Sequence, residues 1–151
     1  MAIARGAGTE IIRTVHLETV SNSAEELIFG VQHHIYTVLS IIVHAVSLNA
    51  EGDYTHCYLQ AYDSLSGESA QSINLFKQDM TTSASFVWND KFSFMGAEPT
   101  DFSAGLDSAA KQDAIADQAQ NTAQKLFIVG EHGSDNFDVT CTFIDQNNAS
   151  E

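Results

Sequence analysis

The stretch HHIYTVLSIIVHAV, residues 33–46, is the most apolar part of this 151-residue chain and decides its fold class. Several of its apolar residues recur at the three- and four-residue spacing of one helix face: Ile35, Val38, Leu39, Ile42, Val43 and Val46. The composition favours a strand, because most of these residues are β-branched. A strand buried on both faces has a continuous apolar run of this kind. We therefore predict the central strand of a β-sandwich here, and neither a helix nor a membrane anchor.

Shorter strand patterns lie on both sides of this stretch. Apolar–polar alternation or a short apolar run predicts six further strands: residues 9–20, 27–32, 54–62, 73–77, 126–130 and 137–144. The segment FVWNDKFSFM, residues 86–95, is either a tight hairpin around Asn89 and Asp90 or one strand with a bulge. About eight short strands separated by turn residues are typical of an all-β protein. We predict an antiparallel, jelly-roll-like β-sandwich.

The segment 97–125 interrupts this rhythm. It is rich in Ala, Gln and Asp and has no strand pattern. Asp107 or Ser108 could cap a helix that runs to about Ala123. We predict a short helical or irregular insertion in a single sandwich domain of residues 11–146, with an arm at 1–10 and a polar tail at 147–151.

The charge of the chain is unbalanced, with 20 acidic and 6 basic residues and a formal net charge of −14. A surface of this charge repels phosphates and anionic lipid headgroups, so neither nucleic acid nor a membrane is an expected partner. Both arginines, Arg5 and Arg13, lie close to the N-terminus. They indicate an arm that docks on an acidic partner, and a frayed terminus without a partner is the alternative.

No pattern of catalytic residues stands out, so we expect no enzymatic activity and no cofactor. The chain lacks the nucleophile elbow, the phosphate-binding glycine loops and the H-E-x-x-H zinc motif. The adjacent His33 and His34 would point to opposite faces of a strand, so they do not make a metal pair. Glu131, Asp135 and Asp138 could gather calcium, but a polar turn between two strands is the simpler interpretation.

The cysteines and the apolar runs bear on the compartment. Cys57 and Cys141 fall in alternating apolar runs, as buried free thiols do, and two cysteines are too few for a disulfide scaffold. The N-terminus lacks the apolar core of a signal peptide, and no run reaches the roughly 18–20 apolar residues of a membrane span. We expect a protein that is made in the cytoplasm and stays soluble.

Aromatic residues are the remaining candidates for a binding surface. Tyr54, Tyr58 and Tyr62 lie on one side of the predicted strand 54–62, and Trp88 is the single tryptophan. These side chains could cover part of the core. They could equally contact another subunit, because Tyr and Trp are enriched at interfaces.

The order of the segments resembles a known group of proteins. YTVLSIIVHAV is followed by a Tyr-rich alternating strand, by INLFK, by a loop of small residues before FVWNDKFSF, and finally by LFIVGEHGSDNFDVTCTFI. In residues 30–95 and 125–146 this order is similar to that of small β-sandwich virion proteins of tailed bacteriophages, particularly phages of marine bacteria such as cyanobacteria.

The resemblance implies a structural part of a phage particle, located in the virion, without catalytic residues or metal. Within that group we expect a capsid decoration or cement protein that binds the assembled shell in many copies or as a homo-oligomer. Its partners would be the major capsid protein or other virion proteins. Arg5 and Arg13 would then pair with acidic groups of the shell, and the Tyr and Phe surface would be buried. A neck, tail or fibre subunit and a carbohydrate-binding β-sandwich are the alternatives.

Overall fold

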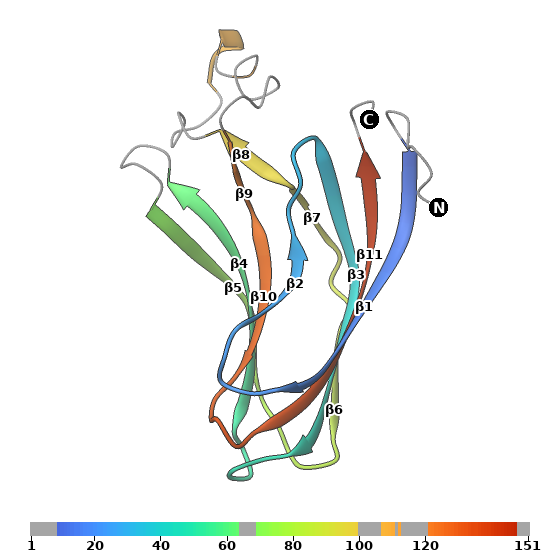
Figure 1. Ribbon diagram of the computed structural model, residues 1–151, viewed down its shortest axis with the longest axis vertical. Helices are drawn as coiled ribbons and strands as arrows, with labels where there is room; N and C mark the ends of the chain where they lie inside the picture. The colour runs from blue at the N-terminus through green and yellow to red at the C-terminus, as the bar shows by residue number, and fades with distance from the viewer. Residues whose placement is uncertain (1–8, 64–68, 100–106, 111, 113–120, 148–151) are drawn as a thin grey trace.

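Figure 1 shows the computed structural model, which describes residues 9–63, 69–99, 107–110, 112 and 121–147. Eleven strands are assigned in the described chain: β1 (Thr9–Val20), β2 (Glu25–Phe29), β3 (His34–Ser47), β4 (Tyr54–Asp63), β5 (Ser69–Asp79), β6 (Ser85–Trp88), β7 (Phe92–Met95), β8 (Ala97–Pro99), β9 (Asn121–Ala123), β10 (Lys125–Gly130) and β11 (Asn136–Asn147). No helix among the described residues is long and apolar enough to cross a membrane.

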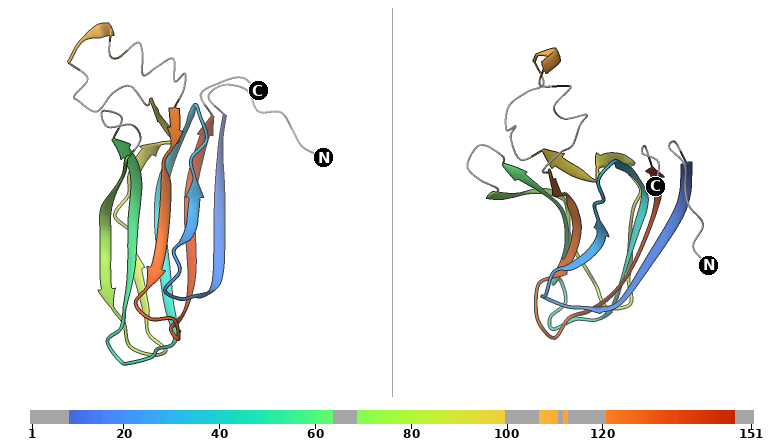
Figure 2. Two further views of the ribbon diagram at one scale, coloured as in Figure 1. Left: turned by 60° about the vertical axis from the view of Figure 1, so that its left-hand side comes forward. Right: turned by 45° about the horizontal axis from the view of Figure 1, so that its top comes forward.

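Two antiparallel sheets face each other and enclose the core, as Figures 1 and 2 show. Sheet A has the strand order β1-β11-β3-β6, with β7 also paired to β3, and sheet B has the order β2-β10-β4-β5. Along these strands the chain changes sheet at every connection except β4–β5 and β6–β7. When β6 and β7 count as one strand, this is the connectivity of an eight-stranded jelly roll. The predicted antiparallel, jelly-roll-like sandwich is confirmed.

β3 is an interior strand of sheet A, as predicted, but only one of its faces is fully buried. The buried side chains alternate regularly except for one three-residue step: His34, Tyr36, Val38, Ile41, Val43 and Ala45. On the other face Ile42 is 40% exposed and Val46 is 41% exposed. The prediction that this strand is buried on both faces is therefore wrong.

A β-bulge at Leu39 causes that three-residue step. Ser40 pairs with Thr142 of β11, and the next pair joins Val38 to Phe143, so Leu39 has no partner of its own. A bulge inserts one residue and turns the side chains beyond it to the other face. The helix-like period in the sequence does not follow this inward set, because only Val38 and Val43 of its six residues are buried and it combines apolar residues of both strand faces.

β6 and β7 are two parts of one edge strand. β6 pairs with Ile41–His44 of β3, and β7 pairs with Ile35–Val38 of the same strand, both antiparallel. Residues 89–91 between them are not assigned to a strand. Of the two interpretations of FVWNDKFSFM the tight hairpin is wrong, and the segment follows one edge of β3 as the single-strand interpretation requires, with a break at residues 89–91 where a bulge was expected.

The connection between β7 and β10 holds the predicted insertion. Its ends pair as the two-stranded sheet β8–β9, with Ala97 opposite Ala123. Among its described residues, helical backbone is confined to 109–110 and 112, where the Gln112 N–H donates to the Ser108 carbonyl at 3.1 Å. The predicted helix running to Ala123 is wrong at its end, because residues 121–123 form a strand.

Both ends of the sandwich domain lie further out than the predicted boundaries. β1 begins at Thr9, which pairs with Asn147, so residues 9, 10 and 147 belong to sheet A. The rest of the predicted arm, with Arg5, lies outside the described residues.

The core lies between the sheets and is almost entirely apolar. Its largest fully buried side chains include Phe137, Ile41 and Leu126. The two cysteines, Cys57 and Cys141, are buried free thiols, as predicted. Burial raises the pKa of both thiols, to about 12 for Cys141, so neither is a thiolate at neutral pH.

Candidate partner-binding site

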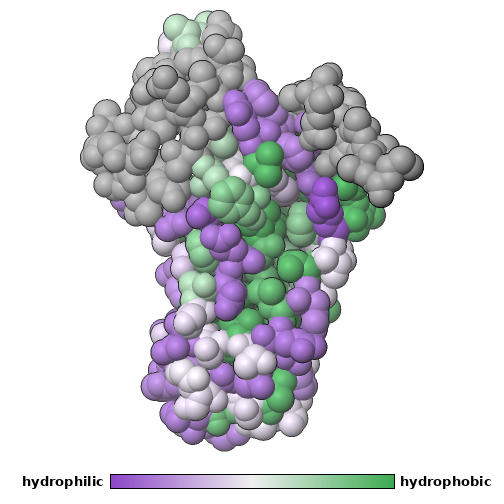
Figure 3. Space-filling model, in the orientation of Figure 1, coloured by the Kyte–Doolittle hydropathy of each residue, from purple (hydrophilic) through white to green (hydrophobic). Residues whose placement is uncertain are grey.

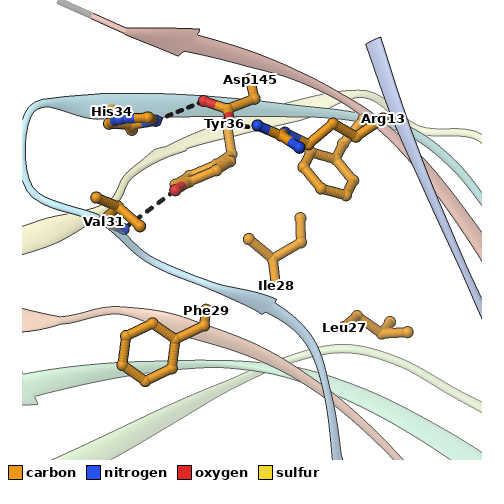
Figure 4. Close-up of a pocket in the computed structure, with 9 residues that line it drawn as sticks. Arg13, Leu27, Ile28, Phe29, Val31, His34, Tyr36 and Asp145 are labelled. Atoms are coloured by element: carbon orange, nitrogen blue, oxygen red, sulfur yellow. Dashed lines mark hydrogen bonds and ion pairs between the residues drawn. The ribbon is translucent and has the colours of Figure 1, made fainter. Parts of the chain in front are cut away.

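A pocket opens between β1 and β2 (Figure 4). In Figure 2 the two sheets diverge toward the end at which β1 begins and β11 ends. The volume of the pocket is about 260 Å³. We call it the β1–β2 pocket, and nine residues line it: Arg13, Leu27, Ile28, Phe29, Val31, His34, Tyr36, Phe143 and Asp145.

One wall of the pocket carries a buried carboxylate held by two basic side chains. Asp145 continues the inward alternation of β11 beyond Phe143 and is only 4% exposed. Arg13 Nε donates to Asp145 Oδ2 at 2.9 Å, and His34 Nδ1 lies 2.6 Å from Asp145 Oδ1. A buried carboxylate needs such partners to offset its loss of hydration. The trio joins β1, β3 and β11 at the rim of the pocket (Figure 4).

The opposite wall is apolar and comes mainly from β2 and the turn that follows it. Leu27 and Ile28 are buried, whereas Phe29 is 56% exposed and Val31 is 48% exposed. The Val31 N–H donates to the Tyr36 hydroxyl at 3.1 Å, which ties this turn to β3. Figure 3 shows hydrophobic surface running between the two sheets on this side of the molecule. The pocket is therefore amphipathic.

Sequence reasoning named Arg13 but missed its neighbours in the pocket. Asp145 lies 132 residues after Arg13 and 111 residues after His34 along the chain. The inward alternation of β11 was visible, and its extension by one step would have placed Asp145 inside. The acidic group that Arg13 meets here belongs to its own chain, and its predicted pairing with a shell stays a prediction.

The predicted aromatic surface is divided between two environments. Tyr54 and Tyr58 lie on β4: Lys77 Nζ is 3.9 Å from the Tyr54 ring centroid, and Tyr58 stacks on Phe127 at 5.1 Å. Trp88 is partly buried and packs toward the core, with its ring centroid 5.4 Å from that of Phe92. The side chain of Tyr62 lies outside the described part of the chain. Their role in binding a partner stays a prediction, and Trp88 does not form an open platform with the tyrosines.

The loops at the opposite end of the sandwich gather carboxylates and a histidine. The ligand atoms of Asp53, Glu131 and His132 all lie within 4.8 Å of one another. One carboxylate oxygen of each acid is already used by the backbone, since Asp53 accepts from the Ala50 N–H and Glu131 from the Tyr54 N–H. Asp135 likewise accepts from the Asn49 and His132 N–H groups.

This arrangement differs from the calcium cluster considered from the sequence. The group contains Glu131 but neither Asp135 nor Asp138, which lies on β11 and accepts from the Thr19 N–H at 3.4 Å. The carboxylates of Glu131 and Asp135 thus cap backbone N–H groups of these loops. This use agrees with the interpretation of the segment as a polar turn.

The middle of the outward face of sheet A, between Glu10 on one side and Glu18 and Asp138 on the other, has no acidic side chain. Three cross-strand rows define what we call the outer patch: Ile12–Ile144–Thr37–Ser93, Thr14–Thr142–Ser40 and His16–Thr140–Ile42–Val87. None of these side chains is a carboxylate, an ammonium or a guanidinium group. Ile12 is 72% exposed and Val87 is 54% exposed.

Hydrogen bonds between neighbouring strands hold the polar side chains of the outer patch. Thr37 Oγ1 lies 2.8 Å from Ser93 Oγ, and His16 Nδ1 lies 2.7 Å from Thr140 Oγ1. Because these groups bond one another, they require less from water than free hydroxyls do. The patch is therefore a surface of mainly β-branched side chains without a carboxylate, and its His16 lies 3.7 Å from Glu18 at the margin.

No protein-family model and no curated protein sequence matches this chain. Among solved structures it is similar to a subunit of Bacillus endospore appendages, described as disulfide-linked pili. The TM-score is 0.42 and the identity 13%, over 99% of this chain and 97% of that one.

A second likeness is to infectious bursal disease virus. The VP2 subviral particle gives a TM-score of 0.47 at 9% identity, over 97% of this chain. The Gx strain gives 0.47 at 8%, over 94% of this chain. The present chain spans 34% of those viral chains. These likenesses are distant ones of β-sandwich architecture. The resemblance to virion proteins of tailed bacteriophages remains an interpretation of the sequence.

Proposed function

We propose that this protein is a non-enzymatic structural subunit that works in many copies, and that copies bind one another through the outer patch. The carrying observation is the contrast between that patch and the whole chain. Two molecules of net charge −14 repel each other. They can approach closely with least repulsion through the outer patch, which carries no carboxylate itself, although Glu10, Glu18 and Asp138 lie on the same face at its margins. Ile12, Ile42 and Val87 supply exposed apolar surface in the patch.

The size of the outer patch sets its role in such a contact. With about 4.8 Å between strands and 3.4 Å between residues, the three rows span roughly 14 by 14 Å. A stable interface buries about 800 Å² on each partner, which is several times this area. The patch, which includes the edge strand β1, would be the dry centre of a larger contact.

A charged residue in the outer patch is expected to prevent association. Ile42→Glu and Val87→Glu each place a carboxylate inside the outer patch, where it would lose hydration in the contact and face the other copy. We expect the affinity between copies to fall roughly a hundredfold or more, in line with the cost of an unpaired buried charge. Sedimentation velocity at several protein concentrations measures the change.

The matched control for this experiment is Ile73→Glu. Ile73 is 57% exposed on β5 of sheet B, away from the outer patch. This variant should associate like the wild type. A wild-type protein that stays monomeric at every concentration, or an Ile42→Glu protein that associates normally, would rule out the patch as the contact.

Within this class we propose a component of a tailed-phage virion, and more narrowly a capsid decoration or cement protein. The sequence resemblance and the basic N-terminal segment with Arg5 and Arg13 support this choice. A neck, tail or fibre subunit is the second candidate, because the same resemblance to virion proteins supports it.

Removal of residues 1–8 is expected to abolish attachment to purified shells while the sandwich stays folded, because β1 begins only at Thr9. Co-sedimentation with shells measures attachment, and circular dichroism checks the fold. Unchanged attachment would contradict a docking arm. The copy number in purified particles separates the candidates, since many copies spread over the head indicate decoration and a few at one vertex indicate a neck or tail.

A further inference from the structure

We propose that the β1–β2 pocket binds a small carboxylic acid with a short apolar tail, of the medium-chain fatty acid class. The proposal is carried by the pocket itself and does not depend on the outer patch or on association between copies. Three features of the pocket support it: an arginine with unused donors, an apolar wall and a limited volume.

The arginine would bind the carboxylate. Asp145 accepts from Arg13 Nε at 2.9 Å and so holds the guanidinium plane in place. Among the described residues no partner bonds the two terminal nitrogens of Arg13, and its side chain is 50% exposed at the pocket. A guanidinium binds a carboxylate through a fork of parallel N–H groups. Both Asp145 oxygens already accept hydrogen bonds, so a second carboxylate can use the donors that remain.

The apolar wall would bind the tail of the acid. Leu27, Ile28 and Phe143 are buried beside the pocket, and Phe29 and Val31 expose apolar surface to water. Covering this surface with methylene groups is favourable by about 25 cal/mol per Å². Figure 4 shows these side chains of β2 and its following turn opposite Arg13 and Asp145, so head and tail groups have separate walls.

The volume and the charge together restrict the ligand class. At about 260 Å³ the pocket is slightly smaller than the roughly 300–1,000 Å³ of sites for drug-sized ligands, which suits a short chain. A neutral alcohol of the same length can accept a single hydrogen bond from Arg13, whereas a carboxylate accepts two and carries the opposite charge. A cationic amphiphile is repelled by the guanidinium.

Isothermal titration calorimetry on the full chain, with octanoate, 1-octanol and octylammonium as probes, tests the proposal. Octanoate should bind with one site per chain, and the other two should bind roughly tenfold or more weakly. Affinity should rise about fourfold per methylene from hexanoate to octanoate. In two-dimensional NMR spectra the shifts should centre on Phe29, His34 and Tyr36.

Two variants locate the binding. Arg13→Gln should reduce the octanoate affinity roughly ten- to a hundredfold and leave that of 1-octanol unchanged. Because the loss of Arg13 also affects Asp145, Val31→Glu is a second variant: it adds a negative charge at the exposed mouth and should weaken octanoate alone. Val87→Glu, on the outer patch, should change neither.

Several results would overturn the proposal. These are no binding of octanoate, equal affinities for octanoate and 1-octanol, shifts scattered over the surface, or undiminished octanoate binding in both Arg13→Gln and Val31→Glu. Association between copies is measured separately, so failure of the outer patch leaves this test unaffected.

Discussion

Deletion of Ile42 is expected to destabilise the protein severely, whereas deletion of Leu39 leaves it folded. Both changes shorten β3 by one residue, but only Leu39 is the extra residue of the bulge. Without Leu39, Val38 and Ile41 are separated by Ser40 alone, so all inward side chains stay inward. The loss is that of one partly buried leucine, about 1–2 kcal/mol.

Without Ile42 the strand has no such solution. If the bulge is kept, Val43 and Ala45 turn to the outer face, although both are fully buried in the native protein. If the bulge is given up instead, Ser40 enters the core and Ile41 leaves it. Either change removes large buried side chains, and we expect a loss of about 4 kcal/mol or more in the free energy of unfolding.

Thermal unfolding followed by circular dichroism measures the difference between the two deletions. For a chain of this size 1 kcal/mol corresponds to roughly 2–4 °C, so the Ile42 deletion should lower Tm by about 10 °C or prevent folding. The Leu39 deletion should cost a few degrees. If the two variants were equally stable, the bulge would not be the reason for the phase change in β3.

Substitution of Gly30 by alanine is expected to disrupt the end of the sandwich beside the β1–β2 pocket. A Cβ atom at Gly30 would lie closer than 3.0 Å to the carbonyl oxygens of Gly96 and Gln124. These are backbone atoms that cannot rotate away. They also belong to a hydrogen-bonded junction, in which the Gly30 N–H donates to the Gln124 carbonyl at 2.8 Å and the Gln124 N–H to the Gly96 carbonyl at 3.0 Å.

The substitution must therefore separate three chain segments that are distant in sequence. We expect a cost above the roughly 1–3 kcal/mol of ordinary overpacking, because backbone hydrogen bonds break as well. Urea unfolding measures the stability, and hydrogen exchange of the Gln124 amide reports on the junction itself. Gly133→Ala is the matched control, since the nearest atom to its new Cβ is Asn22 Oδ1 at 3.5 Å. Equal stability of the two variants would contradict the close approach at Gly30.

The positions of most strands could be predicted from the sequence, because side-chain alternation is a local property. β1 coincides with the predicted segment 9–20, and β11 contains the predicted segment 137–144. The inward set Phe137, Val139, Cys141 and Phe143 is buried as expected. The burial of the two free cysteines followed from the same alternation.

The two wrong predictions have the same cause, because each concerns a feature that depends on segments distant in the sequence. The outer face of β3 was expected to be buried, but Ile42 there is 40% exposed. The end of the insertion was expected to be helical, but residues 121–123 pair with 97–99, which lie more than twenty residues earlier. Helix propensity and apolar content say little about such partners.

The candidate site divides in the same way. The basic residue Arg13 and the acidic excess are visible in the sequence, and so is the run of apolar residues after Glu26. The meeting of Arg13 with Asp145 and His34 depends on β1, β11 and β3 being neighbours in one sheet. The outer patch likewise exists only because side chains of separate strands come into register and form three cross-strand rows.

The sequence by itself determined the all-β class, the strand positions and the buried face of β11, since each depends on neighbours two residues away along the chain. The tertiary structure alone decided the order of strands in the jelly roll, the bulge at Leu39, the β1–β2 pocket and the outer patch. The physical reason is that strand pairing is a contact between distant segments. Its register is set by the best packing of the whole core and not by any one strand.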